Sequence, residues 1–376
     1  MPSTRYREWI SRKARRVVVK IGTNALTDDR GRLDLAFISD MASQVAQLMR
    51  QGVSVVLVSS GAVGAGMAEL NLDERPKRLP LLQATAAIGQ GQLMRHFYDA
   101  FGQFGVKVAQ VLVTRGDFES RRSYLNLRNT LASLQVYQAV PIINENDAVA
   151  VDELPSGERG KFGDNDIIAA LVANMLRADL LMILSVVDGV LKGGQVLDVV
   201  EDAAAGQAVV TGSRSRLGSG GMGTKLTAAG MVAQAGELAV VANARAPHVL
   251  PRILSGEKLG TVIVPAQSKM ASRRRWIAQA SRAAGRIVVD AGAAKALREG
   301  GKSLLPSGIT AVTGRFAKGA SVLILDPAGV EIAKGLTNYS SDDIARIKGL
   351  KTAQIAKLLG QQPHEEVVHR NNMTVG

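Results

Sequence analysis

Three groups of residues in this chain have the types and spacing that chemistry on a phosphate requires. Lys20 ends a β-branched run beside a small polar turn, a group of amides and carboxylates lies between Asn144 and Asp166, and Lys225 closes a glycine-rich segment. Transfer of a phosphoryl group needs mainly in-line positioning and neutralisation of spread negative charge, for which lysines, backbone amides and metal-organising carboxylates are suited. The sequence therefore predicts a phosphoryl-transfer site that uses a nucleotide donor.

Two glycine-rich segments are candidates for holding phosphate. Residues 59–66 (SSGAVGAG) lack the closing Gly-Lys-Ser/Thr of a Walker loop and the spacing of a dinucleotide fingerprint. Such a turn can bind an anion through backbone amides and the positive end of the next helix, or it can only allow close packing of that helix against its strand. The second segment precedes a helical pattern, and we expect it to form a phosphate cradle with a second cation. It consists of Ser219, Gly220, Gly221, Met222, Gly223, Thr224 and Lys225.

A cluster of short amides and carboxylates occupies two stretches of the chain. Residues 144–147 (NEND) come where a predicted strand ends, and residues 164–166 (DND) begin a predicted helix. Such side chains are suited to grip an ammonium group, to orient lysines and to contact a magnesium-bound phosphate. Asp164 or Asp166 could instead cap the helix that follows. A merely solvated acidic loop has no reason to begin on a buried strand, so we favour a functional site.

The identity of the acceptor follows from the groups around it. The candidate residues include no general base, which a hydroxyl acceptor usually needs. A carboxylate with an ordinary pKa of about 4.3 is already ionised at neutral pH and needs mainly positive charge around it. The expected product is therefore an acyl phosphate.

The periodicity of residues 17–266 is typical of an α/β domain with an open, mostly parallel sheet sandwiched by helices, because short β-branched runs alternate with longer helical patterns. Ligands bind at the carboxyl ends of the strands in such sheets, which is where Lys20 lies. We expect strands at 17–20, 53–58, 108–112, 140–143, 181–184, 238–241 and 261–264. We expect helices, among others, at 35–51, 81–104, 124–137, 166–176 and 224–237.

The predicted domains are a basic N-terminal lead, a catalytic domain, a linker, a small β-rich unit and a tail. Short strands separated by glycine or proline turns favour a small barrel-like domain over an extension of the sheet. In that domain we expect strands at 286–290, 308–313, 321–325 and 331–335, and helices at 291–299 and 341–347. The polar tail is expected to be poorly ordered. The boundaries are 1–16, 17–267, 268–284, 285–362 and 363–376.

Composition limits the class of protein. The sequence contains no run of about 18 apolar residues and no signal-peptide core, which argues against a membrane span and favours the cytoplasm. Zero cysteines exclude disulfides and thiolate chemistry, and the four histidines show no metal-ligand spacing, so no protein ligands for a metal are expected. The net charge is +13, with over half of the excess after residue 270. Such a balance can favour RNA, or it can serve only solubility.

Taken together, the motifs resemble the glutamate 5-kinase family. The resemblance rests on residues 18–23 (VVKIGT), 59–62 (SSGA), 143–149 (INENDAV), 163–166 (GDND) and 220–225 (GGMGTK). Residues 303–309 (SLLPSGI) and 312–314 (VTG) are similar to the PUA domain of many bacterial members. The glycine loops are shared with the wider amino acid kinase family, whereas the INEND run together with a PUA-like end is specific. Across nearly the whole chain, the resemblance implies the amino acid kinase fold followed by a small C-terminal β-rich PUA-like barrel.

The activity that this resemblance implies is phosphorylation of the γ-carboxylate of L-glutamate by ATP with Mg²⁺. The product would be L-glutamyl 5-phosphate, in the first step of proline biosynthesis. Carried over by position, Lys20 and Lys225 stabilise the transferring group, and Asp166 holds both lysines in place. A homo-oligomer, dimer or tetramer, is a family expectation. Because the acyl phosphate is labile and the chain has no cysteine to reduce it, hand-over to a separate glutamyl phosphate reductase is expected.

The remaining site residues are also implied by position. Ser60, Asp147 and Asn165 correspond to substrate-binding residues. The nucleotide side includes Lys20, Ser185 and the segment that ends in Lys225.

One departure from the family pattern is Ser185-Val186, where relatives commonly have Thr-Asp. A nucleotide-contacting carboxylate is therefore missing, while Asp188-Gly189 keeps the following turn. We expect altered nucleotide affinity or base preference more than loss of activity.

Two alternative functions remain open. One is an amino acid kinase that acts on another carboxylate, namely acetylglutamate, aspartate or carbamate; the PUA-like end and the NEND run disfavour it. The other is a protein that chiefly binds RNA through its PUA-like domain.

Overall fold

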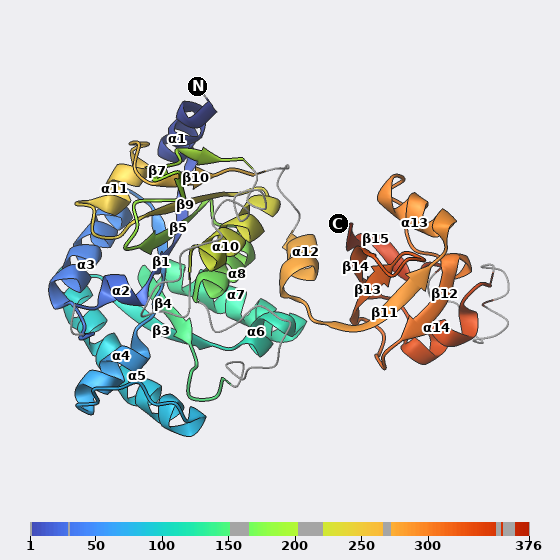
Figure 1. Ribbon diagram of the computed structural model, residues 1–376, viewed down its shortest axis with the longest axis horizontal. Helices are drawn as coiled ribbons and strands as arrows, with labels where there is room; N and C mark the ends of the chain where they lie inside the picture. The colour runs from blue at the N-terminus through green and yellow to red at the C-terminus, as the bar shows by residue number, and fades with distance from the viewer. Residues whose placement is uncertain are drawn as a thin grey trace. The chain divides into compact units, whose positions relative to one another are not determined.

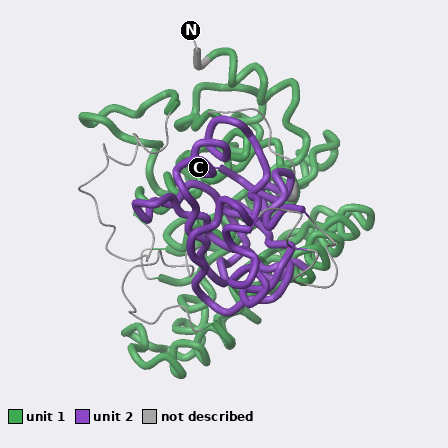
Figure 2. The backbone as a smooth tube through the Cα atoms, turned by 90° about the vertical axis from the view of Figure 1, so that its right-hand side faces the viewer, with its two compact units in different colours: residues 1–118, 122–269 green, residues 119–121, 270–376 purple. Residues whose placement is uncertain are grey.

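The structure of the chain is a computed structural model, and it describes residues 2–28, 31–150, 165–201, 221–265, 272–350, 355 and 365–375. The chain divides into two compact units (Figure 2). The first comprises Met1–Phe118 and Arg122–Lys269, and the second comprises Glu119–Arg121 and Met270–Gly376. Within the described ranges, no helix is long and apolar enough to cross a membrane.

The first unit is built on an eight-stranded sheet with the order β3-β4-β2-β1-β5-β9-β10-β8. Neighbouring strands from β3 to β9 run parallel, and β10 runs antiparallel to β9. Strands such as β1 read as continuous β-branched runs because both faces of the sheet are buried. The predicted sheet and all of its expected strands are confirmed. The strands are β1 (Arg16–Ile21), β2 (Ser54–Val58), β3 (Lys107–Val113), β4 (Ala139–Glu145), β5 (Leu180–Ser185), β8 (Val199–Val200), β9 (Leu238–Asn243) and β10 (Thr261–Ile263), with a separate hairpin of β6 (Leu191–Lys192) and β7 (Gln195–Val196).

Helices cover both faces of this sheet (Figure 1). On one face, alternate residues of β1 (Val17, Val19 and Ile21) share a core with side chains of α1, α3, α5 and α11. Helices α8 and α10 pack against each other and against the sheet; α8 is almost entirely buried, and α10 buries one face. The helices are α1 (Pro2–Lys13), α2 (Thr23–Leu26), α3 (Leu35–Arg50), α4 (Ala62–Glu69), α5 (Leu79–Gly102), α6 (Arg115–Glu119), α7 (Arg121–Val136), α8 (Asn165–Leu176), α10 (Met222–Gln234) and α11 (Val249–Leu254).

The expected basic lead at 1–16 is part of the first unit. Most of it forms α1, and Ile10 and Ala14 are buried in the same core as β1. The Arg7 guanidinium, 6% exposed, donates to Asp198 Oδ1 at 2.6 Å and to the carbonyls of Glu257 and Gly260 at 2.7 and 3.0 Å. One buried arginine and two apolar side chains fix this basic helix to the unit.

We expect Arg7→Ala to lower the free energy of unfolding by about 3 kcal/mol, because it removes the donor from several carbonyls and the nearest cation from the partly buried Asp198 carboxylate. Thermal unfolding followed by circular dichroism measures this loss. Arg50→Ala, which removes an exposed arginine from the end of α3, is the matched control and should change stability by less than about 0.5 kcal/mol. Equal stability of the two variants would show that Arg7 does not anchor α1.

The second unit is a mixed five-stranded sheet with the order β12-β11-β13-β14-β15. Its core is made by apolar side chains of these strands and of two helices. The predicted small β-rich domain is therefore present, and its expected strands and helices are found. The elements are α12 (Ser272–Arg275), the π-helix η1 (Trp276–Ala280), β11 (Ala283–Val289), α13 (Ala291–Arg298), the 3-10 turn η2 (Pro306–Gly308), β12 (Ile309–Thr313), β13 (Ser321–Leu325), β14 (Glu331–Thr337), α14 (Ser341–Ile347) and β15 (Val368–Val375).

Two expected boundaries of this unit need correction. The predicted tail at 363–376 contains a strand, β15, which pairs antiparallel with β14 and buries Val368 and Met373. Most of its side chains are at least partly exposed, and its two buried residues are five positions apart, so the sequence shows no period of two. The predicted linker at 268–284 includes helical turns in which Trp276 and Ile277 are buried.

Candidate active site

A buried cluster of three charges lies at the carboxyl end of β1. Lys20 Nζ lies 2.6 Å from Asp166 Oδ1, and Lys225 Nζ lies 3.1 Å from Asp166 Oδ2. All three residues are buried: Lys20 is 5% exposed, Asp166 is 0% exposed and Lys225 is 7% exposed. One carboxylate therefore holds two ammonium groups side by side, and the cluster keeps one net positive charge.

Secondary structure brings these residues together from distant parts of the chain. Lys20 is one residue from the end of β1, Asp166 is in the first turn of α8, and Lys225 is in the first turn of α10. Thr224 Oγ1 donates to Asp166 Oδ2 at 3.2 Å, so both helix starts are linked. The positive ends of two helix dipoles thus meet beside the lysines, which favours a bound anion.

The pKa of Asp166 reflects two opposing effects. Burial raises it, but the charges and hydrogen bonds of Lys20 and Lys225 outweigh burial and hold the pKa below its usual value of 3.8. Asp166 is therefore ionised at every pH at which the enzyme would work. Its position at a helix start suggested a cap, yet its side chain is used by the two lysines.

A second polar group lies at the carboxyl end of β2. Asn165 Nδ2 donates to Ser60 Oγ at 2.9 Å, which joins the starts of α8 and α4. Gly61, between Ser60 and α4, has φ +95°, a conformation that favours glycine. Asn165 Oδ1 is buried and accepts no hydrogen bond from any residue that the structure describes. The structure thus places two of the three predicted substrate-binding residues together, with one acceptor atom left for a ligand.

The glycines of residues 59–66 serve more than one purpose. A Cβ on Gly66 would lie 1.8 Å from the Thr85 carbonyl oxygen, and one on Gly89 would lie 1.9 Å from that of Ala62. Helices α4 and α5 therefore pack at backbone distance. The packing alternative was correct in kind, but the contact is between two helices and not between helix and strand.

The NEND run is divided between structural and exposed positions. Asn144 Nδ2 donates to Gln90 Oε1 at 2.8 Å, and Asn144 Oδ1 accepts from the backbone of Glu145 at 2.9 Å. This amide fixes the end of β4 against α5. Asp147, the third predicted substrate residue, lies half-exposed in the turn after β4.

Gln90 is a buried polar residue that the sequence did not reveal as a partner of the NEND run. It is 8% exposed, and its Nε2 donates to no partner within the described residues. Its Oε1 accepts from Asn144 at the end of β4, and its neighbour Gly89 touches the start of α4. The only signal in the sequence is a glutamine between two glycines of a helix.

The other side of Lys20 is formed by the carboxyl ends of β5 and β9. Ser185 is paired with Asn243 in register, and Asn243 Nδ2 donates to Asp188 Oδ1 at 2.8 Å. Val186 is 47% exposed at this edge. The predicted phosphate cradle is partly described. Gly221 caps α10, and residues 222–225 form the first turn of that helix. Ser219 and Gly220 lie outside the described residues.

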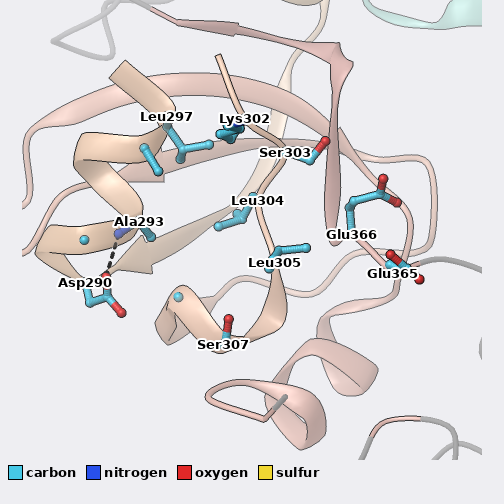
Figure 3. Close-up of a pocket in the computed structure, with 13 residues that line it drawn as sticks. Asp290, Ala293, Leu297, Lys302, Ser303, Leu304, Leu305, Ser307, Glu365 and Glu366 are labelled. Carbon is cyan, nitrogen blue, oxygen red and sulfur yellow. Dashed lines mark hydrogen bonds between the residues drawn. The ribbon is translucent and has the colours of Figure 1, made fainter. Parts of the chain in front are cut away.

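The second unit has a cavity of about 480 Å³ between α13 and η2 (Figure 3). Its lining includes Asp290, Glu365, Glu366 and a single ammonium group, that of Lys302. The Asp290 carboxylate accepts from the Ala293 amide at 2.7 Å and caps α13. Among the lining residues that the structure describes, three carboxylates outnumber one cation, a balance that disfavours phosphate groups.

Comparison with known proteins places this geometry in a family. A model of the amino acid kinase family matches residues 15–243. The chain is 45% identical to a protein named Glutamate 5-kinase from Caldanaerobacter subterraneus subsp. tengcongensis, over 96% of this chain and 97% of that protein. It is 44% identical to another of that name from Geobacter sp. (strain M21), over 98% of this chain and 100% of that protein. The chain belongs to the glutamate 5-kinase branch of the amino acid kinase family.

Other comparisons agree with both parts of the fold. A PUA domain model matches residues 285–359. A carbamate kinase from Giardia lamblia bound to AMP-PNP superposes with a TM-score of 0.50 at 20% identity, over 67% of this chain and 99% of that chain, which shows the amino acid kinase fold alone.

Proposed function

We propose that this chain transfers the terminal phosphoryl group of ATP to the γ-carboxylate of L-glutamate, giving L-glutamyl 5-phosphate for proline biosynthesis. The observation that carries the proposal is the Lys20–Asp166–Lys225 cluster, which offers two ammonium groups and no general base. An acceptor that is ionised at neutral pH needs this kind of site. The family membership of the chain agrees with it.

From the order of the strands we infer that the two substrates bind on opposite sides of the cluster. β1, which carries Lys20, lies between β2 on one side and β5 on the other. The acceptor belongs over β2, where Ser60 and Asn165 meet, and the nucleotide over β5 and β9, beside the start of α10. The attacking carboxylate, the phosphorus and the leaving oxygen then lie in line across β1, as phosphoryl transfer requires.

Each side chain has a defined role in this arrangement. The Lys20 and Lys225 ammonium groups donate to the phosphoryl oxygens, whose charge they neutralise in the transition state. Asp166 keeps both amines oriented without touching the substrate. Asn165 Oδ1, which lacks a donor within the described residues, suits the ammonium group of glutamate, as does the carboxylate of Asp147.

Mg²⁺ fits this site as the counter-ion of ATP. When bound, it would supply positive charge that offsets the charge of the phosphate groups. Asp166 is already bound to two ammonium groups and is not free to act as a ligand. The protein therefore holds the metal through the nucleotide.

Trapping the product with hydroxylamine tests the proposed function. With purified protein, Mg²⁺, ATP and L-glutamate, we expect a hydroxamate, because acyl phosphates react with hydroxylamine and phosphate esters do not. Acetylglutamate, aspartate and carbamate serve as parallel acceptors in a coupled ADP-release assay. Release of ADP with one of these and not with L-glutamate would overturn the acceptor assignment.

Val186→Asp is expected to lower the KM for ATP by about tenfold. Position 186 is exposed at the nucleotide side, and a carboxylate there can accept a ribose hydroxyl, a bond worth about 1.5 kcal/mol. The KM for L-glutamate, measured in the same assay, is the internal control and should not change. An unchanged KM for ATP would count against a nucleotide contact at this position.

Several further features belong to the same proposal. We infer a homo-oligomer, dimer or tetramer, and hand-over of the labile product to a separate glutamyl phosphate reductase, since the chain has no cysteine to reduce an acyl phosphate. A cytoplasmic location is inferred from the use of ATP. RNA binding by the PUA domain stays a prediction, tested by salt-sensitive retention of RNA on the full chain.

A further inference from the structure

We infer a second ligand site in the first unit, in a groove beside α1, for an anion that carries a flat ring. The groove encloses about 470 Å³ and lies between one face of α1, the turn from α10 to β9, and Pro265. Small-molecule sites commonly measure about 300–1,000 Å³. Nothing in the proposed kinase reaction uses this groove, so the inference does not rest on that function.

The two faces of α1 differ in their contacts. Arg7, Ile10 and Ala14 lie on the buried face and fix the helix to the unit. Arg5, Trp9, Arg12 and Lys13 line the groove at a spacing of four, seven and eight residues, which places them on one face of a helix. The groove therefore lies against a helix that is already held in place, which reduces the cost of ordering its side chains on binding.

The charge of the groove points to an anion. Within the described ranges, no hydrogen bond or ion pair is found for Arg5, Arg12 or Lys13. Cations in the last turn of a helix, such as Arg12 and Lys13, are favourable there without any ligand. Arg5 lies in the first turn, which contains no acidic residue and where the helix dipole disfavours a cation. The helix dipole does not explain a cation at the position of Arg5, whereas a bound anion would.

Two carboxylates also line the groove and limit what it can bind. Glu8 is exposed on the edge of α1, and Glu237 is 2% exposed and has an interaction of its own. Three cations against two carboxylates leave the groove with one net positive charge. A ligand with one or two negative charges fits this balance better than a long polyanion.

Two aromatic rings indicate the rest of the ligand. Tyr6 and Trp9 are half-buried, pack against the core and line the groove. The opposite wall presents Leu238 and Pro265. A flat ring can stack between such surfaces while a phosphate reaches the arginines, as in binding of nucleotides by aromatic and basic side chains. The chemistry that matches is that of a nucleoside monophosphate.

The groove is separate from the candidate active site. It lies where α1 leads into the amino end of β1, whereas Lys20 lies near the carboxyl end of that strand. A strand of this length separates its two ends by roughly 17–20 Å. A nucleotide bound at one site therefore leaves the other accessible.

The test uses the fluorescence of Trp9. The chain has two tryptophans, Trp9 and Trp276, so Trp276→Phe leaves Trp9 as the only one. The active site is first saturated with L-glutamate and a non-hydrolysable ATP analogue, and AMP is then titrated. We expect saturable quenching with a Kd below about 1 mM. Calorimetry of AMP binding to the wild-type chain, under the same saturation, gives a second measurement if the Trp276 variant does not fold.

Substitutions in the groove test whether AMP binds there. Arg5→Ala with Arg12→Ala should weaken AMP binding at least tenfold, and Arg50→Ala, at the end of α3, should leave it unchanged. Absence of saturable binding, or equal loss in the control, would overturn the inference. If inorganic phosphate alone competes as well as AMP, the ring-binding part is wrong. Binding of a short single-stranded RNA but not of AMP would replace the inferred site with a nucleic-acid contact.

Discussion

Lys20→Ala and Lys225→Ala should each reduce kcat about 10³-fold and leave the fold intact. Each ammonium group lies in a buried site where it can neutralise charge that develops on the phosphoryl oxygens, and loss of one such donor costs about 10²–10³ in rate. Arginines in the corresponding role of other phosphoryl-transfer enzymes contribute 10³–10⁵. Turnover is measured by hydroxamate formation at saturating ATP and L-glutamate.

Lys77→Ala is the matched control for these two variants, because Lys77 is exposed and far from β1 in sequence. It should have wild-type turnover. Both lysine variants should stay folded, because Asp166 keeps one lysine partner in either case. Circular dichroism checks that each variant is folded. Near-normal turnover in a folded Lys20 or Lys225 variant would show that the residue does not act on the phosphoryl group.

Asp166→Asn should reduce both stability and turnover. The substitution preserves shape but leaves two buried ammonium groups without their counter-charge, and breaking a buried pair in this way costs about 3–5 kcal/mol. Because both amines then lose their orientation, we expect kcat to fall about 10²-fold. Asp198→Asn is a useful control for stability, since that carboxylate pairs with Arg7 away from the active site and should not lower kcat.

The pH dependence of stability separates Asp166 from other carboxylates. Its pKa is lowered in the folded chain, so its contribution is present above the unfolded pKa of about 3.9 and is lost as the pH falls through the folded value, which lies below 3.8. The difference in free energy of unfolding between wild type and Asp166→Asn should be constant from about pH 8 to 5 and shrink only below about pH 4. A difference that already shrinks between pH 7 and 5 would contradict the assigned ionisation.

Local patterns in the sequence predicted most of the fold. Strand β1 could be predicted because both of its faces are buried, and α3 because Asp34 accepts from the Phe37 amide at its start. β15 was missed because its sequence is polar and only pairing with β14 makes it a strand. Helix α1 was missed because its anchor, Arg7, bonds to residues about 190 to 250 positions away in the chain.

The site was predictable to the extent that its residues lie at the ends of elements. Lys20, Asp166 and Lys225 stand at a strand end and two helix starts, which parallel topology brings to one edge of a sheet. Gln90 could not be predicted, because it bonds to Asn144 at the end of β4 from the middle of α5, where Gly89 packs against the start of α4. Close packing of this kind leaves no period or motif in the sequence.

A crystal structure with L-glutamate and a non-hydrolysable ATP analogue tests the central claim most directly. The claim is that the Lys20 and Lys225 amines flank the transferring phosphoryl group while Asp166 holds them. We expect both Nζ atoms at about 2.7–3.2 Å from oxygens of the terminal phosphate, with the glutamate γ-carboxylate in line over β2. Either amine beyond hydrogen-bond reach of that phosphate, or the carboxylate on the β5 side, would contradict the account.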